Sequence, residues 1–159
     1  MINVLQTDKQ ITIIAALAEG SSICSIERMT GVHRDTIMRL GVKVGQGCTA
    51  LMDSTMRDLT CNRLEMDEIW GFIGKKDRHV RDGDDPRLGN VWPFCAIDAE
   101  IKLVPAFRVG NRDAETAVGL HFAYYNFVRR HNTIRCTPAM AAGVTPTFWT
   151  AGDLVEATA

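Results

Sequence analysis

The stretch that decides the fold is Leu64–Ile73, which reads LEMDEIWGFI. Its closely spaced apolar residues predict a strand, and three carboxylates lie among them. Successive side chains on a strand point to opposite faces, so Asp67 and Glu68 cannot both reach one metal ion. A carboxylate on a buried strand is costly unless it is paired or bound to a cation. Asp67 or Glu68 is therefore a candidate functional residue.

A hairpin is expected downstream of this strand, after the polar stretch Gly74–Gly89. Val91–Ile97 predicts one strand, residues 98–100 a turn, and Ile101–Val109 the return strand. A helix is then expected to open at residues 111–113. A strand with a central acid, followed by a hairpin and a helix, is the way an RNase H-like domain begins.

Upstream of the strand, three short helical patterns follow one another. Ile11–Ala18 carries an apolar stripe that stops at Gly20, and a second helix ends at Gly31. The third has Ile37 and Leu40 as its inner face. The short turn and helix spacing predict a helix-turn-helix, whose last helix enters the major groove of DNA. The polar residues available to DNA are His33, Arg34, Asp35, Thr36, Arg39 and Lys43. A plain packing unit with solvated basic side chains remains the alternative.

Near the C-terminus, residues 120–128 predict a helix whose aromatic face is core. A basic cluster follows it, because residues 121–136 hold three arginines and no acid. Such a local patch suits an anionic partner although the whole chain is almost neutral. Arg129, Arg130 and Arg135 are its arginines.

The composition of the chain fits a globular protein. It has 159 residues, 46% of them hydrophobic, and a net charge of -1. The longest early apolar run, Ile11–Ala18, is far shorter than the roughly 20 residues that a membrane span needs. We therefore expect no membrane partner and a cytoplasmic location. The five cysteines form no C-x-x-C pair, which argues against a disulfide framework and a structural zinc site.

Two blocks of the sequence resemble the transposases of the insertion sequence one type. The first is Met66–Lys76, MDEIWGFIGKK, with the hairpin Phe94–Val109; the second is Tyr124–Met140, with its Tyr-Asn, Arg-His and Thr-Pro-Ala-Met elements. The resemblance covers nearly the whole chain. It implies a DDE enzyme with a helix-turn-helix, an RNase H-like domain and Mg²⁺ as cofactor. It also implies that Asp67 is the first catalytic, metal-binding carboxylate.

The second block begins sooner than the family pattern requires. In the family a second catalytic Asp and a Glu precede the Tyr-Asn element, whereas here that element closely follows residues 111–117. We therefore expect an internal deletion joined near residues 117 and 118, bridged by one long helix. No residue matches the second or third catalytic position. A substitute triad of Asp67, Asp98 and Glu115 is disfavoured, because Asp98 lies in a turn and Glu115 opens a helix.

These patterns together predict an α+β protein. We expect a helix-turn-helix in residues 1–47 and a linker helix in 48–62. A truncated RNase H-like (α/β) domain with about three strands and a long C-terminal helix would fill 63–159. The lost strands would leave an open sheet edge, which invites pairing with another chain. Weak stability or dimerisation is therefore expected, and the expected partner is a second copy of the chain, in a homo-oligomer, or a full-length transposase.

Three functions are consistent with this interpretation. The first is a transposase-derived protein that binds double-stranded DNA at element ends, holds no productive Mg²⁺ and does not transfer strands alone. The second is an active DDE transposase with a rearranged metal site, and the third is a non-functional remnant. Tyrosine-recombinase chemistry is disfavoured because the aromatic face is expected to be buried. The expected DNA contacts are His33, Arg34, Thr36, Arg39, Lys43, Arg129, Arg130 and Arg135.

Overall fold

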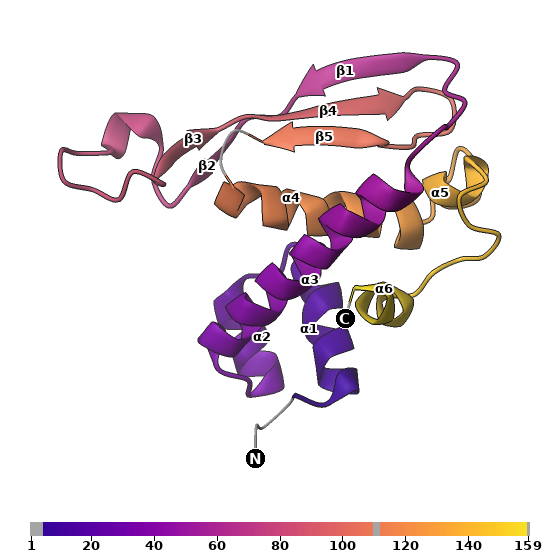
Figure 1. Cartoon of the computed structure of the whole chain (residues 1–159). Helices are drawn as coiled ribbons and strands as arrows, with labels where there is room; N and C mark the ends of the chain where they lie inside the picture. Colours follow the sequence, from indigo (N-terminus) through magenta and orange to yellow (C-terminus); the bar gives the residue numbers. More distant parts are fainter. Residues whose placement is uncertain (1–4, 110–111, 159) are drawn as a thin grey trace.

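The computed structural model describes residues 5–109 and 112–158, and these form an α+β protein, as predicted. The described residues contain six α-helices, a three-stranded antiparallel sheet and a two-stranded ribbon. Figure 1 shows the sheet as the top layer, with one helix directly beneath it and the N-terminal helices below. None of the described helices has the length and apolar character needed to cross a bilayer.

The first two helices begin and end close to where the sequence predicts, and the third begins there. The three helices are α1 (Thr7–Ala18), α2 (Ile23–Thr30) and α3 (Arg34–Thr55). The side chain of Ser22 caps α2 by accepting a hydrogen bond from the backbone N–H of Ser25 at 3.2 Å. Gly31 ends α2 in the left-handed conformation, with φ of 68°. A small core holds these helices together, made of Ile13, Ile26, Val32 and Ile37.

α3 is longer than the sequence predicts. It continues past Gly47, without a break, through the first half of the expected linker helix. The reason is visible in its buried side chains, because Val44, Cys48 and Met52 follow one another at one-turn spacing. This stripe belongs to the main hydrophobic core, so burial holds the helix together beyond Gly47.

The sheet consists of β1 (Leu64–Glu68), β4 (Pro93–Asp98) and β5 (Ala106–Val109), in the order β1-β4-β5. A separate ribbon pairs β2 (Gly71–Ile73) with β3 (Gly89–Val91). One register runs through both, and the N–H of Ile69 donates to the carbonyl of Pro93 at 2.8 Å between them. The expected strand over residues 64–73 is thus present but interrupted at 69 and 70. Its far half projects from the molecule as an arm (Figure 1).

The polar stretch 74–89 contains a 3-10 turn, η1 (Asp77–His79), and its last residue begins β3. One sequence expectation in this region was wrong, because the return strand begins at Ala106 rather than at residue 101. Lys102 has a positive φ of 62°, and the backbone of Val104 is bonded to a side chain from another element. Both features take residues 101–105 out of the ladder.

The C-terminal part forms the long helix that the sequence predicts. α4 (Arg112–Ala123) runs directly into a π-helical turn, η2 (Tyr124–Val128), across the expected join at residues 117 and 118. The expected opening at Asn111 lies outside the described residues. α5 (Pro138–Ala141) and α6 (Ala151–Ala157) complete the fold. As expected, the face of α4 and η2 is core, with Leu120, Ala123 and Phe127 buried.

α3 and α4 cross closely at glycines. A Cβ on Gly45 would collide with the backbone carbonyl of Thr116, and one on Gly119 would collide with the side chain of Thr49. Two small residues therefore set the distance between the helices. Below this crossing, α6 packs against α1 and α3, so the C-terminal segment is fixed to the N-terminal helices.

Candidate functional site

Asp67 is the last but one residue of β1, at the edge of the sheet. Its partner across the ladder is Cys95, so both side chains point to the face that carries the main core. Contrary to expectation β1 is not a buried strand, since all five of its residues are exposed. Its outer edge has no strand partner among the described residues. The cost of burying a carboxylate therefore gives no reason to infer a bound cation at Asp67.

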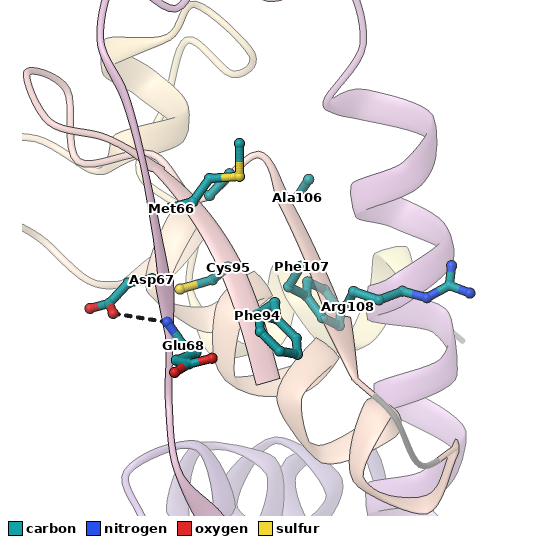
Figure 2. Close-up of a pocket in the computed structure, with 9 residues that line it drawn as sticks. Met66, Asp67, Glu68, Phe94, Cys95, Ala106, Phe107 and Arg108 are labelled. Carbon is teal, nitrogen blue, oxygen red and sulfur yellow. Dashed lines mark hydrogen bonds between the residues drawn. The ribbon is translucent and has the colours of Figure 1, made fainter. Parts of the chain in front are cut away.

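The surroundings of Asp67 are open. Its Oδ1 accepts a hydrogen bond from the backbone N–H of Glu68 at 2.8 Å. Glu68 pairs with Phe94 and so points to the opposite face, as strand alternation predicts. Asp67 and its neighbours border a shallow depression of about 500 Å³ (Figure 2). In that view Asp67 and Arg108 point to opposite sides of the sheet.

Asp98 has a structural role rather than a place beside Asp67. It pairs with Leu64 at the far end of β1, on the other face of the sheet. Its Oδ1 accepts hydrogen bonds from the N–H groups of Glu100 at 2.8 Å and Ile101 at 3.1 Å. Burial acts to raise the pKa of Asp98, but these hydrogen bonds, together with those from the Asn62 N–H and the Cys61 thiol, outweigh it, so the pKa lies below its usual value. The side chain of Glu115, the third member of the substitute triad, lies outside the described part.

The described residues therefore offer little to a metal ion. No group of three His, Cys, Asp or Glu side chains among them could hold one. Cys95, opposite Asp67, is a neutral thiol, because burial and then the charge of Asp67 raise its pKa. A two-metal centre needs several carboxylates around ions about 3.5–4 Å apart. Among the described residues, Asp67 therefore has no such carboxylates around it.

The predicted DNA contacts of α3 lie on an exposed strip at its N-terminal end. Arg34, Arg39 and Lys43 are exposed, and none of them forms an ion pair with another described residue. Thr36 is half-buried. His33 caps the helix, since its Nδ1 accepts from the N–H of Asp35 at 3.3 Å.

The predicted C-terminal contacts form a second, separate group. Arg129, Arg130 and Arg135 are exposed, and they lie between η2 and α5. Figure 1 shows α5 at the opposite end of the molecule from the beginning of α3. His131 turns inward, and its ring lies against Tyr125 with a centroid distance of 4.4 Å. The structure thus does not bring the two groups of basic residues together.

Comparison of the chain with known proteins gave no match to any protein-family model, curated protein or solved structure.

Sequence reasoning missed one surface, the sheet face opposite α4. Alternation places Met66, Glu68, Phe94, Ala96, Ala106 and Arg108 on this face, which we call the open face. Met66 is 88% exposed and Phe94 is 52% exposed. The signal was present in the sequence, because even-numbered positions from 64 to 72 are mostly large and apolar. Without the strand order, however, this apolar pattern predicted a buried strand.

Proposed function

We propose that this chain is a DNA-binding protein derived from a transposase of the insertion sequence one type, and that it does not transfer strands by itself. The observation that carries the proposal is the arrangement of α2 and α3. Three residues, 31–33, join the two helices, and Gly31 supplies the left-handed turn. This length and glycine position are typical of a helix-turn-helix.

The contacts between the helices support the same proposal. Ile26 of α2 and Ile37 of α3 are fully buried in the same small core. Glu27 Oε1 accepts a hydrogen bond from the N–H of Arg34 at 3.0 Å, which ties the end of α2 to the first turn of α3. A recognition helix must be held rigidly, because base contacts depend on its angle in the groove. The polar strip of α3 is left free on the outer side.

The division of roles along α3 follows from its geometry. Residues of the first turn, such as Arg34, would reach base edges, and Arg39 and Lys43 would meet phosphates. Met38 and Val42 are exposed on the same strip. Apolar side chains at such positions can contact the methyl group of thymine.

The catalytic half of the proposal rests on the sheet. An antiparallel β1-β4-β5 order with Asp67 within the first strand is compatible with the start of an RNase H-like domain. The open edge of β1 is where further strands of such a domain would pair. A single carboxylate cannot hold two ions, so we expect no Mg²⁺-dependent cleavage or joining.

The deciding experiment measures binding of the purified chain to DNA from the ends of its own element and to a scrambled duplex, across a salt series. We expect tighter binding to the end DNA and a linear fall of log K with log salt. Equal, weak binding that vanishes with salt would overturn the proposal, because only non-specific phosphate contacts would then exist.

Matched variants locate the contact. Arg34→Ala should reduce the preference for end DNA at one or two base pairs, at a cost of about 1–3 kcal/mol. Lys43→Ala should weaken binding to all sequences alike and lower the salt slope by about 1. The control is Arg57→Ala, two residues beyond the C-terminal end of α3, where the guanidinium is paired with Asp53 at 2.7 Å. A loss with Arg57→Ala as large as with Arg34→Ala would place the DNA elsewhere.

A further inference from the structure

The open face carries an unusual pattern of size and charge. Ladder pairing aligns its residues in two rows across β1, β4 and β5. One row runs from large to small, Met66–Ala96–Ala106, and the other has an acid, an aromatic ring and a base, Glu68–Phe94–Arg108. No described element covers this face, and Figure 1 shows all the helices on the other side of the sheet.

The charges of the second row are not used within the chain. Among the described residues, neither Glu68 nor Arg108 takes part in an ion pair. Their strands lie on either side of β4, and Phe94 stands between them. An exposed apolar patch with an unpaired acid at one end and an unpaired base at the other marks an interaction surface.

We propose that the open face is a homodimer interface, on which the same face of a second copy packs as in a β-sandwich. A two-fold axis parallel to β4 lays β1 of one copy over β5 of the other. Met66 then meets the second copy's Ala106, and Phe94 meets the second copy's Phe94. Glu68 meets the second copy's Arg108, and the reverse pair forms by symmetry. At the two outer strands large therefore faces small and acid faces base, while at the central strand Phe94 faces Phe94 and Ala96 faces Ala96, across the roughly 10 Å that separates packed sheets.

The open edge of β1 is less suitable as a dimer contact, although the sequence predicted that an open sheet edge would pair with another chain. In a two-fold antiparallel pair, residues on the same face oppose each other. A pair centred on Met66 sets Glu65 against Asp67 twice, and pairs centred on Glu65 or Asp67 set each acid against itself. Like charges directly opposite each other destabilise a ladder. These acids therefore disfavour pairing of the β1 edge with the β1 edge of a second copy.

The charge of the open face disfavours DNA as its occupant. Glu68 lies on the open face, whereas Glu65 and Asp67 point to the other face of the same edge strand. The open face therefore carries one acid and one base, with no excess positive charge to attract a phosphate backbone, whereas a second copy meets its complement. The dimer is independent of the DNA-binding proposal, and either can fail alone.

Charge exchange tests the interface. The variants are Glu68→Arg and Arg108→Glu, both at exposed positions, and the measurement is sedimentation equilibrium from 1 to about 100 μM. We expect a wild-type dimer, and each variant should dissociate at least tenfold more readily because it places like charges together. An equimolar mixture of the two variants should form a heterodimer, since arginine then meets glutamate at both ends.

The mixture keeps the test independent of folding, because two unfolded variants could not restore association. Glu156→Arg, on the exposed side of α6, is the charge-matched control and should leave the dimer intact. A wild-type monomer at all concentrations would overturn the proposal. So would dimers that survive both single variants, or variants that stay monomeric when mixed.

Discussion

Asn126 is the residue whose substitution tests the fold most directly. It is fully buried, and it bonds both backbone groups of Val104. Its Oδ1 accepts from the Val104 N–H at 3.0 Å, and its Nδ2 donates to the Val104 carbonyl at 2.8 Å. It therefore does for residues 101–105 what a neighbouring strand would otherwise do.

Asn126→Ala leaves both buried backbone groups of Val104 without partners. Each unsatisfied group costs about 1–3 kcal/mol, so we expect a loss of about 2–5 kcal/mol in the free energy of unfolding. The better helix propensity of alanine offsets only about 0.5 kcal/mol. Because small domains have stabilities of about 5–15 kcal/mol, this is a large fraction of the total.

Urea unfolding followed by circular dichroism measures the effect as a lower midpoint with an unchanged slope. The control is Asn132→Ala, at an exposed position, which should change stability by less than about 0.5 kcal/mol. Asn126→Asp adds a pH test: the introduced carboxyl can donate to the Val104 carbonyl only when protonated, so this variant should recover stability relative to wild type as the pH falls. Equal midpoints for Asn126→Ala and Asn132→Ala would refute the reasoning.

Three further outcomes are expected. Gly45→Ala should lower the free energy of unfolding by about 1–3 kcal/mol, measured by thermal or chemical unfolding, since its Cβ meets the Thr116 carbonyl. Gly41→Ala is the control and should not show this loss, because its Cβ meets only a Leu17 methyl group at 3.3 Å. Similar losses for the two variants would contradict the close crossing of α3 and α4. Burial raises the pKa of the Cys48 thiol to about 12, so a thiol reagent at pH 8 should label exposed Cys24 at once and Cys48 only on unfolding. Rapid labelling of all five cysteines would count against this core. Because the pKa of Asp98 is lowered on folding, its carboxylate stabilises the folded protein near neutral pH, and this stabilisation is lost as the pH falls through the folded-state pKa. Asp98→Asn should lower the free energy of unfolding by about 1 kcal/mol at pH 7 and flatten the acid side of a plot of stability against pH. An unchanged acid side would exclude this role of Asp98.

Local signals explain why much of the fold could be predicted. Ser22 and Gly31 mark the ends of α2 because capping and left-handed turns depend on neighbouring residues alone. The aromatic face at residues 120–128 was correctly predicted to be core for a similar reason, since helical periodicity shows which side chains share a face. The start of the return strand was predicted wrongly because the backbone of Val104 is held by the side chain of Asn126, which lies 22 positions away in the sequence.

For the candidate site, the sequence placed Asp67 on a strand and separated it from Glu68, because alternation is a local property of extended backbone. The sequence also predicted that the basic residues near the N-terminal end of α3 are exposed. It could not show that the arginines at 129, 130 and 135 lie away from these residues, since distance between elements depends on how they pack.

The sequence by itself determined the types and approximate limits of most elements, the charges they carry and the positions of the candidate residues. Only the tertiary structure decided that β1 is an edge strand, that Asp98 is held by its own turn, and that Met66 and Phe94 face solvent. The physical reason is that a strand's pattern of apolar residues is the same whether a helix covers it or a second molecule does. Burial belongs to the assembled layers, not to the strand.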